Sequence, residues 1–573
     1  MKKIRYLLYG ALVVVCLILW NTWQKESPIP TIQKATQEQT QTATKEGYLS
    51  QKEETTPKEE FSKRETNLQK GTKISGRIIH VKTDVLNVNI DTLGGKITRA
   101  TLEKYPETLH GKTPFILLNG EEETLYISQS GMLSSKERGK TPLQYKAEGK
   151  DFVLKKGDDL LKVVLVGKRK DGITVTETFI FKPNKYDINI TYLIKNNEGK
   201  EWTGKHYMQL TRKASQAAKK GTFSLRSFFG VAVSSADSPY QKYKFPKLKK
   251  KPLDESIQGG WLAMVQHYFL SAWVPDPSKE YNYYSQAGEG EVFVVGMVGP
   301  KIKIAPGDSI KIDSNFYAGP KIAKRLDSLS PHLAQTIDYG FLWIIAILLF
   351  KAMKFFYNLI GNWGWAIIIV TALIKLVFYK LSETSYKSMA GMRKLQPKIA
   401  QLKERFGGDK QGFSKAMMEV YKKEKINPLG GCLPIVIQIP VFFALYWVLL
   451  ESVELRQAPF IFWIHDLSAK DPYYILPILM GISMYLQQKL SPAPADPTQA
   501  KVMMFLPVIM TVFFLNFPAG LVLYWFVNNM LSVSQQWYVT KKFEHGGYKK
   551  KKVKDKNKNK KKRPFWWPPS SRG

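Results

Sequence analysis

Cysteine is almost absent from this chain, which has only Cys16 and Cys432 among its 573 residues. Two cysteines so far apart cannot supply the disulfide framework that holds many secreted domains together. Cys16 lies in an apolar run, but Val15 precedes it and large residues follow, so a lipoprotein cleavage site is not indicated. We expect this N-terminal run to remain as an uncleaved membrane anchor.

Catalytic motifs are also missing. All seven histidines lie outside the apolar segments that could span a membrane, and no HExxH zinc motif occurs. Residues 407–412 have the glycine spacing of a phosphate-binding loop, yet Phe413 and Ser414 stand where that loop needs Lys followed by Ser or Thr. These absences predict a protein without enzymatic activity, metal or cofactor.

Acidic residues are absent from the depth of the apolar segments in the C-terminal third. Ion-coupled transporters usually carry Asp or Glu near the membrane midplane, and many are built from internal repeats. A small-solute transporter or channel is therefore only the second choice of function.

Positive charge is abundant, with 85 Lys and Arg against 48 Asp and Glu and a formal net charge of +37. Much of the excess lies beside apolar runs, in residues 380–425 and in the tail after Thr540. Because Lys and Arg collect on the cytoplasmic side of membrane proteins, topology accounts for much of this charge.

The order of these features predicts a multi-domain membrane protein. Polar, aromatic-poor residues indicate a flexible linker after the anchor, and alternating apolar and polar residues then indicate an antiparallel β-sandwich. The predicted parts are an N-terminal transmembrane anchor (1–23), a linker (24–72), an all-β periplasmic domain (73–325), a connector with an interfacial amphipathic helix (326–360), an α-helical core of five transmembrane segments (361–540) and a basic cytoplasmic tail (541–573).

The side of the membrane on which each loop lies determines which apolar segments of the C-terminal third are expected to span it. The five candidates are residues 363–379, 431–450, 473–488, 502–517 and 518–538. A sixth apolar segment, 341–360, would place the Lys-rich residues 381–427 outside if it crossed the membrane, against the positive-inside rule. We therefore predict an interfacial helix at 341–360 and a cytoplasmic helical hairpin at 381–427, with both chain termini in the cytoplasm.

The first predicted span contains a cation, Lys375, which costs roughly 2.5–3.5 kcal/mol at the centre of a spanning helix. Lys375 precedes Lys380 by five residues, about 7.5 Å along a helix, so its side chain can reach the cytoplasmic headgroups by snorkelling. Alternatively it lines a hydrated groove, to which Thr371, Gln438 and Asn528 contribute polar groups. The residues themselves leave both interpretations open.

Several motifs carry a family resemblance. They include Gly361-Asn362-Trp363-Gly364, Asn427-Pro428-Leu429-Gly430-Gly431-Cys432-Leu433-Pro434, Gln438-Ile439-Pro440, Trp463-Ile464-His465-Asp466-Leu467-Ser468 and Phe517-Pro518-Ala519-Gly520-Leu521. These motifs resemble the YidC/Oxa/Alb family of membrane protein insertases. Gly259-Gly260-Trp261-Leu262-Ala263-Met264 through Trp273-Val274-Pro275 resembles the periplasmic β-supersandwich of its Gram-negative members.

The resemblance implies an insertase and chaperone of the bacterial inner membrane. It would insert, fold and help assemble nascent membrane proteins, alone or with the Sec translocon, through a hydrophilic groove open to the cytoplasm and to lipid. Lys375 matches the groove cation of the family, which is usually Arg, and Thr371, Gln438 and Trp525 match other groove positions. Tyr524 and Asn528 complete the candidate groove set, although the two aromatic residues fit interface or core positions equally well.

The hairpin and the tail suggest further contacts. The candidate hairpin contacts with nascent apolar segments are Met389, Met392, Met417 and Met418, although ordinary packing explains them at least as well. The tail is rich in Lys with few interleaved aromatics, so both the ribosome and anionic lipids are plausible targets.

A third interpretation takes the β-sandwich as primary, as a carbohydrate-binding or mutarotase-like module on a membrane anchor. It predicts that the sandwich keeps the essential activity without the helices.

Overall fold

The computed structural model describes residues 76–134, 142–214, 227–424, 426–427, 433–492 and 497–545. The predicted anchor, the linker and most of the basic tail lie outside the described residues, as do both cysteines.

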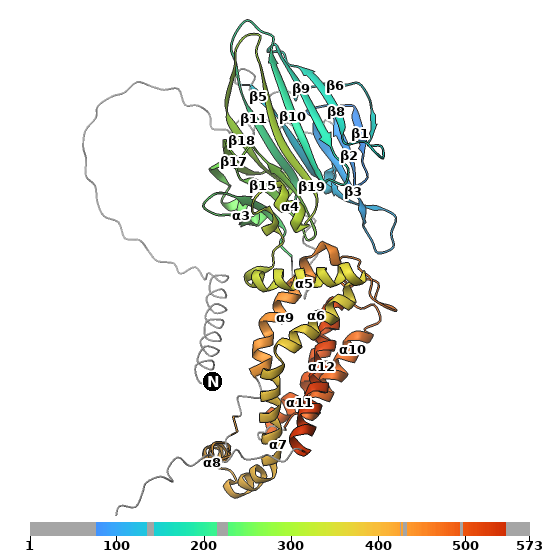
Figure 1. The fold of residues 1–573 in the computed structure, drawn as a ribbon. Helices are drawn as coiled ribbons and strands as arrows, with labels where there is room; N and C mark the ends of the chain where they lie inside the picture. The colour runs from blue at the N-terminus through green and yellow to red at the C-terminus, as the bar shows by residue number, and fades with distance from the viewer. Residues whose placement is uncertain are drawn as a thin grey trace, which may run out of the picture. The chain divides into compact units, whose positions relative to one another are not determined.

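Residues 78–320 form two large sheets, as the alternating pattern predicts (Figure 1). In sheet order, the first contains β14 (Asp254–Gln258), β17 (Glu280–Ala287), β18 (Val292–Ile304), β11 (Trp202–Lys213), β5 (Tyr126–Ser134), β3 (Lys96–Pro106), β2 (Leu86–Asp91), β1 (Ile78–Lys82) and β7 (Asp151–Val153), with β4 (Pro114–Leu118) paired to β3. The second contains β13 (Gln241–Tyr243), β12 (Gly230–Ser234), β15 (Trp261–Val265), β16 (Phe269–Val274), β19 (Ser309–Pro320), β10 (Asp187–Asn196), β9 (Ile173–Phe181), β8 (Leu161–Lys168) and β6 (Tyr145–Ala147). Within the described residues, the strand pairs are antiparallel except for β1 with β7.

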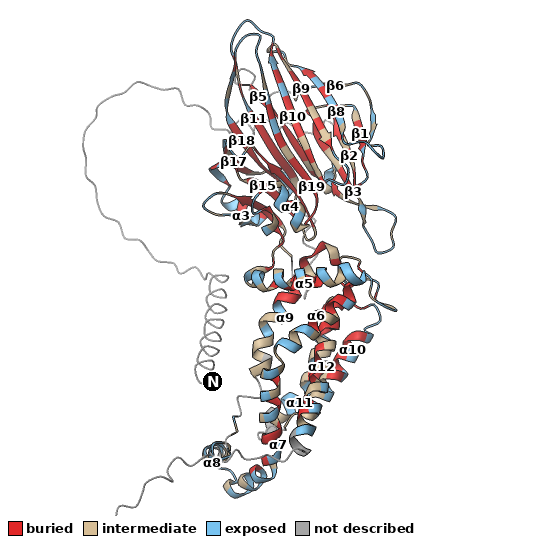
Figure 2. Cartoon of the chain, in the orientation of Figure 1, coloured by how far each residue is buried: buried red, intermediate tan, exposed pale blue. Residues whose placement is uncertain are grey.

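The core of the β-domain lies between the two sheets. Every second residue of β9 is buried, because successive side chains of a strand point to opposite faces. The ring of Trp273 packs 4.8 Å from that of Phe316, and both residues are fully buried. The Tyr126 hydroxyl in the first sheet donates a hydrogen bond to the Met264 carbonyl in the second. These contacts confirm the predicted β-sandwich, whose buried strands are red in Figure 2.

Helices make up the remainder of the described chain. They are α3 (Phe245–Lys250), α4 (Ala323–Leu329), α5 (Trp343–Ile360), α6 (Trp363–Val377), α7 (Tyr379–Phe406), α8 (Lys410–Lys423), α9 (Leu433–Glu451), α10 (Ile475–Leu490), α11 (Pro497–Phe514) and α12 (Ala519–His545). Short 3-10 turns lie between some of them, at η4 (Leu333–Thr336), η5 (Gly340–Leu342) and η7 (Val453–Leu455).

Local sequence explains where some of these helices begin and end. Gly361 ends α5 with a positive φ of 75°, a conformation that glycine adopts without strain. The Asn362 side chain then accepts hydrogen bonds from the backbone amides of Gly364 and Trp365, which caps the start of α6. The Asp471 carboxylate accepts a hydrogen bond from the Leu476 amide and caps α10 in the same way.

The helices follow the predicted segments with shifted ends. The first predicted span extends to residue 379, but α6 ends at Val377 and α7 leaves at a bend of 68°. Helix α11 begins at Pro497 rather than at residue 502, and α12 runs to His545 rather than to residue 538. Apolar composition predicts only the part of a helix that suits a membrane, whereas backbone hydrogen bonding continues into polar sequence.

Judged by length and apolar composition alone, one helix among the described residues is able to cross a membrane, at Gly340–Ile360. The bent pair of α6 and α7 adds a second if it forms one span, and the apolar stretches Val436–Glu451 and Ala500–Phe514 are shorter. The five crossings and the interfacial placement of α5 therefore stay predictions.

The chain divides into two compact units. The first comprises residues up to Val370, Ile437–Pro477 and Phe513–Tyr524, and the second comprises Thr371–Val436, Ile478–Val512 and residues from Trp525.

Candidate functional site

Lys375 lies on the last turn of α6, in the second unit, and is half-buried. Its ammonium donates a hydrogen bond of 2.7 Å to the Ser532 hydroxyl on α12. That hydroxyl donates its own proton to the Asn528 carbonyl, also at 2.7 Å. Among the described residues, no carboxylate forms an ion pair with Lys375. The ammonium is therefore bound by the neutral hydroxyl oxygen of Ser532. The hydrogen bond from this hydroxyl to Asn528 fixes its orientation.

Ser532 belongs to a row of polar side chains on α12. Asn528, Asn529, Ser532 and Gln536 are all buried. Ser532 follows the adjacent pair Asn528 and Asn529 by four and three residues and precedes Gln536 by four, which places the row on one side of the helix. The Asn529 side chain donates to the Ser483 hydroxyl of α10, and the Gln536 side chain donates to the Leu490 carbonyl at the end of α10. The second unit thus contains a polar interior between helices that are otherwise apolar.

The remaining groove candidates fall in both units. Thr371 is buried on α6 in the second unit, and Trp525 on α12 of that unit is half-buried. Gln438 and Tyr524 belong to the first unit, where the Gln438 side chain donates to the Tyr524 hydroxyl at 3.4 Å. The Tyr524 ring also stacks 6.3 Å from that of Phe442.

Two pairs of candidates are thus joined within their units: Lys375 to Asn528 through Ser532, and Gln438 to Tyr524. Ser532 was not among the residues predicted from the sequence. Its spacing from Asn528 could have identified it, because it follows Asn528 by four residues and therefore lies on the same face of α12.

The predicted hairpin contains α7 and α8 on either side of Gly407 and Gly408. The Lys398 ammonium and the Glu424 carboxylate meet at 3.0 Å and join its two arms. Of the four candidate methionines, Met418 is 52% exposed, and the half-buried ones are Met389, Met392 and Met417. Met418 is the one best placed to contact another molecule.

A buried ion pair, not anticipated from the sequence, lies in the first unit at the end of α9. Lys321, directly after β19, meets Glu451 at 2.7 Å, and each side chain is only 1% exposed. The Lys321 ammonium also donates to the Thr336 carbonyl, and His267 hydrogen-bonds the Leu450 carbonyl at 2.7 Å. Burial lowers the pKa of His267, which favours its neutral form.

The segment after α9 adds contacts to the same region. The Arg456 guanidinium donates to the Pro106 carbonyl at 2.7 Å and to the Glu107 carbonyl at 3.1 Å, both at the end of β3. We call this set of contacts the seam, comprising Lys321 with Glu451, His267 with Leu450, and Arg456 with Pro106 and Glu107.

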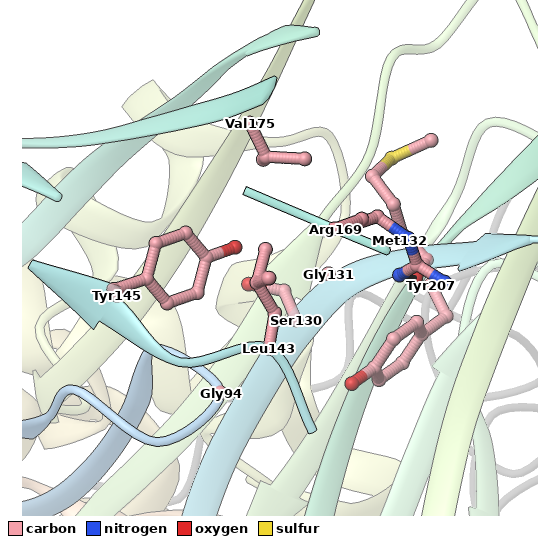
Figure 3. A pocket seen from close by; sticks show the side chains of 9 residues that line it. All are labelled: Gly94, Ser130, Gly131, Met132, Leu143, Tyr145, Arg169, Val175 and Tyr207. Atoms are coloured by element: carbon pink, nitrogen blue, oxygen red, sulfur yellow. Dashed lines mark hydrogen bonds between the residues drawn. The ribbon is translucent and has the colours of Figure 1, made fainter. Parts of the chain in front are cut away.

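A second buried polar cluster lies inside the β-sandwich. The Tyr192 hydroxyl donates to the Glu177 carboxyl at 2.6 Å and also hydrogen-bonds the Ser130 hydroxyl. Burial raises the pKa of Glu177 to about 8, although hydrogen bonds from Tyr192 and Tyr145 act in the opposite direction. Figure 3 shows Tyr145 and Tyr207 on opposite sides of Ser130 in the small pocket beside this cluster.

The fold combines a β-sandwich with a helical region that has a buried polar interior. This combination defines a class of protein, one with a β-domain attached to a helical membrane core. Sequence profiles agree: that of the 60Kd inner membrane protein matches residues 355–546, and that of the YidC periplasmic domain matches residues 78–352. The chain belongs to the YidC family of membrane protein insertases, and its family is one of inner membrane proteins.

Several relatives match nearly the whole chain. The membrane protein insertase YidC of Coxiella burnetii is 47% identical over 561 residues, which are 96% of this chain and 98% of the relative. The same protein of Legionella pneumophila is 46% identical over 553 residues, with 96% and 98% covered. That of Nitrosococcus oceani is 45% identical over 552 residues, with 96% and 100% covered.

The solved structures that the chain matches are more distant. A crystal structure of an active YidC insertase with its first transmembrane domain resolved has 18% sequence identity and a TM-score of 0.38, covering 81% of this chain and 93% of that one. A galactose mutarotase-like protein from Lactobacillus casei has 8% identity and a TM-score of 0.29, covering 42% of this chain and 99% of that one.

Proposed function

We propose that this chain inserts and folds nascent membrane proteins through a polar groove whose cation is Lys375. The observation that carries the proposal is the 2.7 Å hydrogen bond from Lys375 to Ser532, within a buried polar row on α12. A polar surface inside a membrane lowers the cost of bringing a polar segment of another protein partway across, because backbone and side-chain groups then find hydrogen-bonding partners.

In this mechanism Lys375 supplies positive charge and hydrogen-bond donors. An ammonium has three N–H donors, and of the described residues Ser532 is the one seen to accept from it. The other N–H donors of Lys375 are able to bind acidic or polar groups of an incoming segment, or the water around that segment. Thr371, Trp525 and Asn528, in the same unit as Lys375, would line the groove with it. Gln438 and Tyr524 form a hydrogen-bonded pair within the first unit, and their role in the groove follows from the family resemblance alone.

The proposal is tested by replacing the cation. Lys375→Arg keeps the charge and should preserve insertion, whereas Lys375→Glu reverses it and should abolish insertion. The measurement is protease mapping of a small Sec-independent membrane protein in cells depleted of their own insertase. Normal insertion by the Lys375→Glu variant would contradict the proposal, provided that membrane levels of the two variants are equal.

We further propose that the hairpin receives substrate through Met418 and its neighbours, and that the chain works alone or beside the Sec translocon. The basic tail beyond α12 would bind the ribosome or anionic lipid through backbone-directed electrostatics. These partners follow from the family resemblance and from the distribution of charge.

A further inference from the structure

The most basic exposed part of the β-domain surrounds α3. Residues 242–255 contain six lysines and two acidic residues. Five of these lysines lie on or directly beside α3 and are exposed; we call them the α3 lysines, and they are Lys244, Lys247, Lys249, Lys250 and Lys251. Within the described chain, none of the five forms an ion pair.

The helix fixes these lysines to the domain. Its Phe245 and Leu248 are buried, so α3 is held to the β-domain by its apolar side while its lysines face outward. Cations in a last helical turn complement the helix dipole, but five lysines within eight residues exceed what a helix of six residues needs. An anionic partner would relieve the repulsion among these lysines.

Contacts around β13 connect this cluster with the start of α5. Lys242 on β13 donates a hydrogen bond of 2.5 Å to the Asp338 carboxylate, five residues before α5 begins. The Lys242 ammonium also lies 5.6 Å from the Tyr240 ring centroid. Figure 1 shows α3 at the same end of the β-domain as α4, from which the chain continues towards α5. All of these residues belong to the first unit.

The chain at the start of α5 is exposed and apolar. Phe341, in the 3-10 turn before the helix, and Trp343 and Ile344, in its first turn, have 44%, 55% and 67% of their surfaces exposed. A basic cluster and an exposed apolar helix start, connected here through the contact of Lys242 with Asp338, are the two features that anchor proteins at anionic membrane surfaces. The first binds phosphates and the second binds the acyl boundary. An acidic protein would use the charge but has no need of the apolar turn.

We propose that the α3 lysines bind anionic phospholipid headgroups on the outer face of the inner membrane and so hold the β-domain against the bilayer. The inference rests on the proposed topology of α5 and is independent of the groove. It assigns α3 a binding surface for phosphatidylglycerol-type headgroups.

The test uses the full chain in nanodiscs of phosphatidylcholine, with or without phosphatidylglycerol. Brief acylation by a small neutral reagent, followed by mass spectrometry, gives the reactivity of each lysine. With phosphatidylglycerol the α3 lysines should react roughly fivefold more slowly, and high salt should remove the difference because it screens the surface charge. Lys303 and Lys311, which approach Glu201 and Asp313, are internal controls and should not change.

A pair of variants makes the test specific. Lys249→Glu with Lys250→Glu should return Lys244, Lys247 and Lys251 to their phosphatidylcholine reactivity, whereas Lys301→Glu with Lys303→Glu should not. Equal reactivity of the α3 lysines in both lipids would overturn the proposal. Protection seen only in native membranes would also overturn it, in favour of an acidic protein partner. Insertion measured in the same discs reports on the proposed function separately.

Discussion

At the scale of single residues, Ser532 is the structural finding that adds most to the sequence. Lys375 was evident as a charge in an apolar segment, but its hydrogen-bond acceptor lies 157 residues away, and the four-residue spacing from Asn528 was the one sequence signal for it. The hydroxyl of Ser532 donates to Asn528 and accepts from Lys375, so removing it leaves the ammonium without its observed acceptor.

Ser532→Ala should therefore weaken insertion while Ser532→Thr preserves it. A hydrogen bond to a charged group is worth about 1.5–3 kcal/mol, so the rate should fall by roughly tenfold or more. Ser534→Ala is the matched control, because Ser534 lies on the same helix but is exposed. Rates are measured as protease-protected substrate over time, and unchanged insertion by Ser532→Ala would remove Ser532 from the site.

Glu177 gives a prediction about pH. Its pKa is raised by burial to about 8 in the folded protein, against an ordinary value of 4.5. Between these values the unfolded chain loses the proton and the folded domain keeps it, so the stability of the β-domain should fall as pH rises, by about 1.4 kcal/mol per unit, and level off above pH 8. Below pH 4.5 Glu177 is protonated in both the folded and the unfolded state, so its stabilising contribution is fully present and no longer changes with pH.

Urea unfolding of the full chain in detergent, followed by tryptophan fluorescence at several pH values, measures this dependence. Glu177→Gln keeps an oxygen that can accept from Tyr192 and should flatten the profile between pH 5 and pH 8. An equally steep profile in this variant would show that another group is responsible.

At the scale of elements, the seam is the feature that sequence patterns could not provide. Lys321 and Glu451 are 130 residues apart, one directly after β19 and the other at the end of α9. Isolated charges are costly to bury, and the second carboxylate oxygen of Glu451 has no hydrogen-bond partner among the described residues. Such a pair contributes more to the choice of one packing arrangement than to total stability.

Breaking the pair from one side should be more harmful than removing both partners. Lys321→Met or Glu451→Leu alone leaves a buried charge and should destabilise the protein by about 3–5 kcal/mol, whereas the double variant should recover most of the loss. Thermal unfolding in detergent checks this, with Lys303→Met at an exposed position as control. Additive effects of the two single changes would contradict a coupled pair.

Regular elements were predictable because their periodicity is local. The alternation along β9 and the apolar stretches of α6 and α9 were evident from the residues, as was the break near Gly407. The order of strands in the sheets and the contact of Arg456 with the end of β3 were not, because such pairings depend on which segments meet after distant parts of the chain have folded.

At the scale of the whole molecule, the topology is the prediction with the widest consequences. In a chain whose Cys16 and Cys432 are replaced, Lys403→Cys on α7 should react with an impermeant thiol reagent only after the inner membrane is opened. Lys301→Cys on β18 should react from the periplasm at once. Labelling of position 403 in sealed cells would place the hairpin outside and would require α5 to cross the membrane.

The break between α6 and α7 has a mechanical consequence. Helix α7 has 28 residues and is therefore about 42 Å long, and it meets α6 at an angle of 68°. Pro397 lies inside α7, where a proline removes a backbone hydrogen bond and bends the helix, so the rod ends there and comprises 18 residues, about 27 Å. A change of about 5° at the base of this rod displaces its far end by about 2 Å. Phe378, the single residue between the two helices, is thus the hinge about which the part of α7 before Pro397 rotates.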